Sequence, residues 1–231
     1  MVGVITASEP SWTAPFTGLS PRQFGKLVTA TRREGSDPVR KGRPWSLTLE
    51  DRILLVAAYW RTDLTLRQLA PLFGVSKSAA DRMIGHLGPS LALRPRRRFR
   101  KDAVLIADGT LVLLPRDYTV AEQSKNYRYS TNHQVVIDAD TRLVVAVGRT
   151  AVIADGGYPG TGLVIPHRRE RGRTELPAWK EEHNISHRKV RARVFARMKA
   201  WKILRDCRLK GGGVHTAMLG IARLHNLALT G

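Results

Sequence analysis

Three helix-start signals within residues 48–92 constrain the fold of this chain more than any other feature. Thr48 and Ser76 can each accept a hydrogen bond from the first turn of a following helix, and Thr65 and Gln68 have the spacing of a capping box. After each signal, apolar residues recur every three or four positions, which predicts three short amphipathic helices. We therefore expect a compact helical unit.

The junction between the second and third predicted helices indicates how this unit is used. Ala70 and Gly74 lie four residues apart, so that a small residue stands where two helices approach and a glycine stands where the chain turns tightly. This is the pattern of a helix-turn-helix, whose last helix enters the major groove of DNA. Pro71 has no backbone N–H, so we expect a short or distorted second helix.

The third helix divides into two predicted faces. The inward face would consist of Ala79, Ala80, Met83, Ile84 and Leu87. The outward face would consist of Lys77, Ser78, Asp81, Arg82 and His86. Because Asp81 repels phosphate, the predicted DNA contacts on this helix are Lys77, Ser78 and Arg82. A helical bundle used only for packing or dimerisation is the alternative.

The charge of the chain also favours a nucleic-acid partner. Thirty-nine Lys and Arg against nineteen Asp and Glu leave a net charge of +20, and the segment 168–210 carries half of it. A surface this basic requires an anionic partner or screening by salt. A second basic block, 94–101, adds four predicted DNA contacts: Arg96, Arg97, Arg98 and Arg100.

Several classes of protein are excluded or disfavoured. Cys207 is the single cysteine, so the sequence predicts neither an intramolecular disulfide nor a cysteine zinc site, and its histidines are not spaced as a zinc set. We find no P-loop or dinucleotide motif, so no small-molecule substrate is expected. No signal peptide and no apolar stretch of about 18 residues is present, which predicts a cytoplasmic protein without a membrane partner.

Residues 1–45 are expected to form one helix and a basic linker. Ser20-Pro21 is a helix start, and the helix should end near Glu34. Its apolar face would consist of Phe24, Leu27 and Val28. Residues 41–44 are similar to the core of minor-groove AT-hooks, although a plain basic linker is the favoured explanation.

The last two thirds of the chain combine predicted strands with helices. Residues 103–114 have the pattern of an apolar strand interrupted by Asp108-Gly109, and 134–137 with 143–147 have that of a hairpin. A short strand, 152–154, precedes Asp155. From about Pro177 the pattern is helical and basic, with a final helix over about 214–228. One apolar stripe would consist of Val190, Val194, Met198 and Trp201.

Asp108 and Asp155 are the candidate catalytic residues. Each follows an apolar strand and precedes a glycine, and an acid in that position is costly unless it is paired or binds a metal. Two carboxylates at neighbouring strand ends suit phosphoryl transfer with Mg²⁺ or Mn²⁺, whose preferred ligands are oxygens. Two turn-forming Asp-Gly pairs explain the pattern equally well.

The order of five motifs resembles the DDE transposases of bacterial insertion sequences. The motifs are Leu66 to Ser78, Ile106 to Thr110, Lys125 to Ser130, Ile153 to Tyr158 and Phe195 to Lys199. The resemblance covers about residues 19–231 and implies that Asp108 and Asp155 are the first and second catalytic and metal-binding carboxylates. It also implies an α+β fold, in which residues 102–231 form a ribonuclease-H-like domain after an all-helical unit at 46–101.

Two departures from the family pattern indicate damage. Relatives carry a third carboxylate as a Glu after an Arg-Val pair, whereas here Val194 runs directly into Phe195. The nearest upstream acid, Glu182, would lie about 18 Å from Val194 along a helix. Relatives also have about two dozen residues where this chain has only 148–151, and four residues reach about 14 Å. The sheet is therefore predicted to be incomplete or distorted.

These observations lead to two hypotheses of different class. The first is a transposase that binds double-stranded DNA at terminal inverted repeats and cleaves it with a divalent metal, impaired in this copy. The alternative is a non-catalytic DNA-binding remnant that occupies element ends or competes with intact transposase. Either protein would be associated with a bacterial nucleoid, and the sequence leaves open whether it is a homo-oligomer. No residue singles out a host-promoter regulator.

Overall fold

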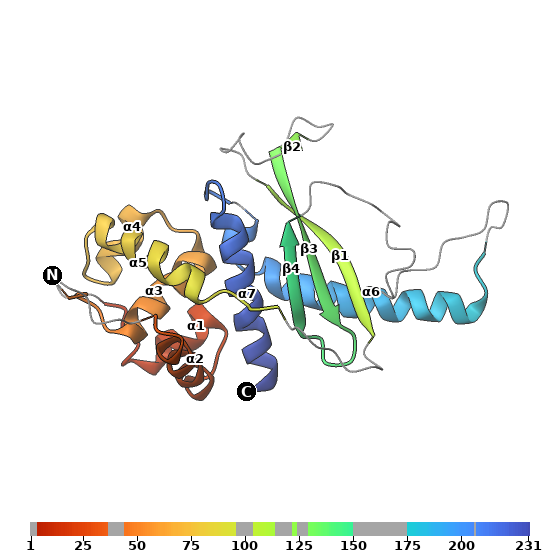
Figure 1. Ribbon diagram of the computed structural model, residues 1–231, viewed down its shortest axis with the longest axis horizontal. Coiled ribbons are helices and arrows are strands. Elements are labelled where there is room, and N and C mark those ends of the chain that lie inside the picture. The colour runs from red at the N-terminus through yellow and green to blue at the C-terminus, as the bar shows by residue number, and fades with distance from the viewer. Residues whose placement is uncertain are drawn as a thin grey trace.

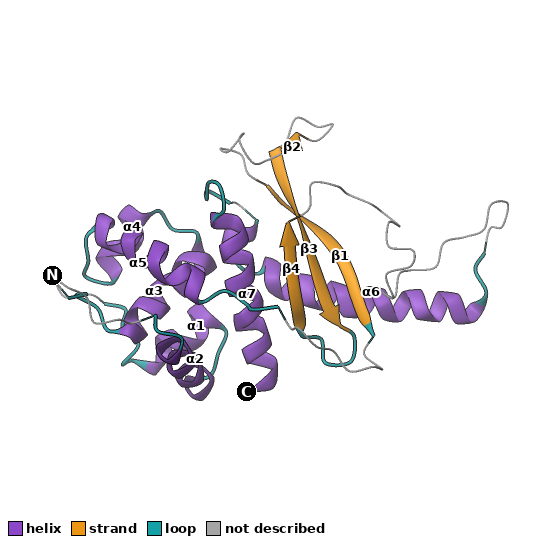
Figure 2. Ribbon diagram, in the orientation of Figure 1, coloured by secondary structure: helices purple, strands orange, loops and turns teal. Residues whose placement is uncertain are grey.

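The computed structural model describes residues 4–36, 44–95, 104–113, 122–123, 129–149, 175–205 and 207–231. Figure 1 shows a helical body built from the N-terminal part of the chain and a small sheet built from the middle part. The C-terminal helix stands between the two (Figure 2). A helical region followed by a region of strands and helices confirms the predicted α+β class.

The first helices form where the sequence places their caps. After η1 (Pro10–Trp12) and α1 (Thr13–Thr17), α2 (Pro21–Arg33) begins with a full capping box. The Ser20 N–H donates to Gln23 Oε1 at 2.8 Å, and the Gln23 N–H donates to Ser20 Oγ at 3.3 Å. The predicted apolar face is buried and consists of Phe24, Leu27 and Val28.

The three helices predicted within residues 48–92 are present as α3 (Leu49–Thr62), α4 (Leu66–Leu72) and α5 (Lys77–Ser90). Thr48 Oγ1 accepts from the Asp51 N–H at 3.1 Å, and Ser76 Oγ accepts from the Ala79 N–H at 3.2 Å. Before α4, Gln68 Oε1 accepts from the Thr65 N–H and hydroxyl.

The turn between α4 and α5 has the geometry that the sequence predicts. Gly74 adopts a φ of +66°, which glycine tolerates because it has no Cβ. The Val75 N–H donates to the Ala70 carbonyl. The helix that contains Pro71 is only seven residues long. The expected short second helix is confirmed.

The sheet is antiparallel, with β3 (Tyr129–Asp138) at its centre. β1 (Leu105–Leu113) pairs with one edge of β3, and β4 (Val144–Arg149) and the short β2 (Glu122–Gln123) pair with β3 as well. β3 and β4 form the predicted hairpin, whose turn is held by the Asp138 carboxylate, which accepts from the N–H groups of Asp140 and Thr141.

The prediction that Asp108-Gly109 interrupts the first strand is wrong. β1 continues through both residues, and Asp108 stands opposite Val135 while Gly109 stands opposite Gln134. A continuous ladder of backbone hydrogen bonds to β3 keeps this segment extended, although both residues are uncommon in strands. Asp108 therefore lies within a strand and not at its end.

One face of the sheet is covered by the C-terminal helices. α6 (Ala178–Lys199) contacts β1, and α7 (Gly213–Thr230) contacts β4, with η2 (Lys202–Leu204) between the two helices in sequence. The stripe predicted on this segment faces inward: Val194, Met198 and Trp201 are buried and Val190 is half-buried. The strand residues buried beneath the helices include Ile106, Val112, Val135, Ile137 and Val147.

α7 joins the helical body to the sheet. The Trp60 ring of α3 packs so closely on α7 that a Cβ added at Gly220 would lie 2.2 Å from it. Arg223 makes two hydrogen bonds to the Glu34 carboxylate and donates to the Ser90 carbonyl at 2.9 Å. None of the described helices is both long and apolar enough to span a bilayer.

Candidate functional site

The predicted DNA-contacting face lies on α5, directly after the turn. Lys77, Ser78 and Arg82 are exposed there, as is Asp81, while Ala80, Met83 and Leu87 are buried. Lys77 and Arg82 lie on α5 away from the helix core formed with α3 and α4. A duplex can therefore reach their cationic groups without any change in the core.

His86 does not share this face as predicted. Its ring is half-buried, its Nε2 lies 3.2 Å from the Ser36 carbonyl oxygen, and it packs on the Trp45 ring at a centroid distance of 5.6 Å. Ser36 and Trp45 flank the linker, so the chain entering α3 covers this side of α5. The sequence pattern of α5 alone could not reveal that contact.

Four of the predicted contacts lie outside the described residues: Arg96, Arg97, Arg98 and Arg100. Arg94, the first cation of the same block, lies 3.5 Å from the Glu34 carboxylate. Of the predicted DNA contacts, the structure therefore describes only those on α5.

Asp108 lies on the helix-covered face of the sheet, between the buried side chains of Ile106 and Thr110. Its Oδ2 lies 3.3 Å from Nε of Arg191 on α6, and the two side chains are 26% and 39% exposed. A carboxylate on an apolar face needs a counter-charge, and Arg191 supplies one. Asp155, its predicted partner in catalysis, lies outside the described residues.

Sequence reasoning missed Arg191. A signal for it exists, because Arg191 precedes Val194 by three residues and so lies on the same face of a helix as that buried residue. The signal identifies the face but not the strand residue that Arg191 meets, 83 positions earlier in the chain.

The described residues do not by themselves fit a divalent metal. They contain no group of three or more His, Cys, Asp or Glu side chains that could hold an ion. Asp108 offers one carboxylate, and a guanidinium already stands beside it. Glu181 and Glu182 are exposed in the first turns of α6, and Glu182 precedes Arg191 by nine residues, about 14 Å along the helix.

The remaining ionisable candidates are part of the packing. His225 Nε2 donates to the Arg142 carbonyl at 3.1 Å, and burial lowers the pKa of His225 below its ordinary value of 6.5. The rings of His133 and His215 stack at 5.9 Å. Cys207 is buried, and burial raises the pKa of its thiol to about 11, which leaves it protonated and a poor nucleophile at neutral pH.

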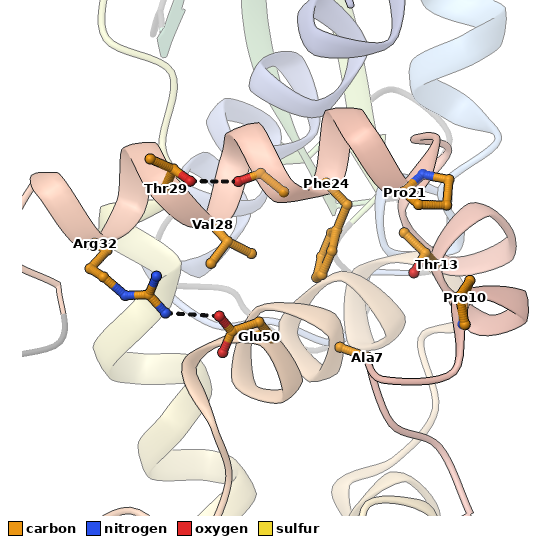
Figure 3. A pocket seen from close by; sticks show the side chains of 10 residues that line it. Ala7, Pro10, Thr13, Pro21, Phe24, Val28, Thr29, Arg32 and Glu50 are labelled. Atoms are coloured by element: carbon orange, nitrogen blue, oxygen red, sulfur yellow. Dashed lines mark hydrogen bonds and ion pairs between the residues drawn. The ribbon is translucent and has the colours of Figure 1, made fainter.

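A pocket of about 300 Å³ lies in the helical body, between α2, η1 and the start of α3. Figure 3 shows Phe24 and Val28 pointing into it, with the Arg32 and Glu50 side chains paired at one end. That ion pair measures 2.8 Å. The pocket belongs to α2 and its neighbours, and it contains none of the predicted catalytic or DNA-contacting residues.

Comparisons with known proteins agree with the helix-turn-helix. A family model described as the helix-turn-helix of DDE superfamily endonuclease matches residues 45–97. A protein of Streptomyces albus G, described as "Putative transposase for insertion sequence element IS112", is 75% identical in an alignment that covers 100% of both chains. The alignment spans 257 positions, so at least 26 of them have no residue in this 231-residue chain. No solved structure matches the chain.

Proposed function

This chain belongs to the DDE transposases of bacterial insertion sequences, and on that premise we propose that it binds the terminal inverted repeats of its own element. The single observation that carries the proposal is the exposed cationic face of α5. This face directly follows the turn in which Gly74 has a positive φ. Lys77, Ser78 and Arg82 contact the duplex, and the arginines of the block 94–101 add phosphate contacts. The binding unit comprises residues 46–101.

We further propose that Asp108 and Asp155 descend from two catalytic, metal-binding carboxylates of a ribonuclease-H-like domain, 102–231, and that this copy cleaves DNA poorly. The absence of an acid near Asp108 on the described part of α6 supports the loss. The 26 or more alignment positions without a residue support it too. A Mg²⁺ or Mn²⁺ ion would supply phosphoryl-transfer chemistry, but Asp108 beside Arg191 does not fit it, so no metal-dependent step follows from this site.

The binding proposal is tested with a labelled duplex that carries the element's own end. Changing Lys77 and Arg82 together to Gln should weaken binding about tenfold and lower the salt slope by about 2, because two phosphate-neutralising cations are lost. Changing Arg22 and Lys26 to Gln removes the same charge from the exposed face of α2, where neither side chain forms an ion pair with any described residue. Equal losses in the two double variants would contradict a specific role for α5.

The same duplex separates the impaired transposase from an active one. With Mg²⁺ or Mn²⁺ added, we expect the chain to bind but to leave the strands uncut, because a missing carboxylate lowers the rate by orders of magnitude. Robust nicking that is abolished by Asp155→Asn would overturn this. A chain with Glu-His-Val restored after Val194 and the missing segment rebuilt is the positive control.

A further inference from the structure

The ion pair between Arg191 and Asp108 joins α6 to β1 on the covered face of the sheet. Arg191 is anchored on the inward side of α6, since Val194 and Met198, three and seven residues further on, are buried beneath the same helix. Asp108 is anchored by the β1–β3 ladder on the strand face that α6 covers. The core therefore fixes both backbones. The packing of α6 on β1 brings the two charged groups together.

The position of Arg191 opposes metal binding at Asp108. A divalent ion needs anionic oxygens converging from several directions, and a guanidinium 3.3 Å from Asp108 Oδ2 places a positive charge where the ion would approach. Glu181 and Glu182 are exposed in the first turns of α6 and do not offset this charge. An ion at this carboxylate must therefore displace the arginine or bind against its repulsion.

We propose that Arg191 is an internal counter-cation that occupies the metal-facing side of Asp108 and keeps this carboxylate from binding a divalent ion. The proposal concerns the site whose cleavage activity we propose to be lost, and it rests on that proposed function. It adds a cause, since a cation stands beside a carboxylate that belongs to no cluster of three or more acids, histidines or cysteines among the described residues. Arg191 acts through Asp108 and is a positioning residue, not a catalytic one.

The test measures Mn²⁺ binding by full-length protein without DNA, from the amplitude of the free-ion paramagnetic resonance signal. We expect Arg191→Gln to bind Mn²⁺ about two- to fivefold more tightly than the wild type, because the variant removes the repulsion between the ion and a partly exposed positive charge. The matched control is Arg193→Gln, which removes the same charge from an exposed position of α6 that pairs with no described residue. A gain in Arg193→Gln equal to that in Arg191→Gln would overturn the proposal.

Asp108→Asn combined with Arg191→Gln shows whether the gain belongs to this carboxylate. The double variant should lose the added Mn²⁺ affinity, and a gain that persists without the Asp108 charge would overturn the proposal. If Arg191→Gln does not fold, Arg191→Met removes the charge but keeps an unbranched apolar side chain. Urea unfolding of Arg191→Met, Asp108→Asn and their double variant should then show coupling between the two positions. Additive effects would contradict a direct pair. DNA binding through α5 is assayed separately, so its failure would leave the metal result standing.

Discussion

At the scale of single residues, burial lowers the pKa of one histidine in the packing of α7. His225 on α7 is buried against the hairpin that joins β3 and β4, and its ring donates to the Arg142 carbonyl. Burial is the largest cause of its lowered pKa, and the charge of Arg197 lowers it further. Folding therefore favours the neutral imidazole, whereas the unfolded chain binds a proton at the ordinary pKa of 6.5.

The sign of this shift predicts how stability depends on pH. His225 contributes its full stabilisation above pH 6.5, and that contribution declines as the pH falls below this value, because protons then bind preferentially to the unfolded chain. We expect His225→Gln to be less stable than the wild type by about 1 kcal/mol at pH 7.5. The deficit should shrink at pH 5.5. Urea unfolding of both proteins at the two pH values measures this, and a deficit that is unchanged or larger at pH 5.5 would rule it out.

At the scale of elements, α6 carries a row of three exposed cations. Lys189, Arg193 and Arg197 succeed one another at intervals of four residues, are exposed, and form no ion pair with any residue that the structure describes. Like charges at this spacing repel one another in an isolated helix. By contrast, Arg191 on the inner side of the same helix is paired with Asp108.

We expect this row to contact DNA phosphates in addition to α5. Changing Lys189, Arg193 and Arg197 together to Gln should weaken binding to duplexes of any sequence and lower the salt slope by about 2 to 3, since each lost contact removes about 0.9. Fluorescence anisotropy between 50 and 200 mM salt, roughly the range over which such contacts are sensitive, measures this. The control changes Arg22, Lys26 and Arg33 of α2, which are equally exposed. If the control lowers the slope as much, total charge and not the row is responsible.

At the scale of the whole molecule, α7 is the element on which the two halves meet. It contacts α2, α5 and β4, and its Gly220 lies against the Trp60 ring with no room for a Cβ. The fixed geometry between the helical body and the sheet depends on that close approach, together with the double hydrogen bond of Arg223 to Glu34.

Gly220→Ala should therefore destabilise the whole chain. We expect a loss of about 1–3 kcal/mol or more in the free energy of unfolding, because the methyl group forces the Trp60 ring or α7 to move. Gly25→Ala is the matched control, since Gly25 is also inside a helix but a Cβ there meets nothing within 4 Å. It should stabilise by up to about 1 kcal/mol. Urea unfolding checks both, and a stable Gly220→Ala would show that the halves are joined differently.

The sequence by itself determined the elements whose causes are local. The caps at Ser20, Thr48 and Ser76 act over three residues, the Gly74 turn over four, and the Asp138 turn over three, so each could be recognised from a short stretch of chain. The exposure of Lys77, Ser78 and Arg82 on α5 followed from helical periodicity in the same way. Local hydrogen bonds and periodicity require no knowledge of distant residues.

Only the tertiary structure decided which distant side chains meet. The continuation of β1 through Asp108-Gly109 depends on its pairing with β3, and His86 faces the linker because Ser36 and Trp45 pack there. The contacts of Arg191 with Asp108 and of Trp60 with Gly220 join residues that are 83 and 160 positions apart. A sequence pattern shows that a carboxylate is present. It does not show whether a metal ion or an arginine lies beside it. The packing of α6 on β1 brings the arginine to it, because burying the apolar sides of both elements fixes which polar groups lie between them.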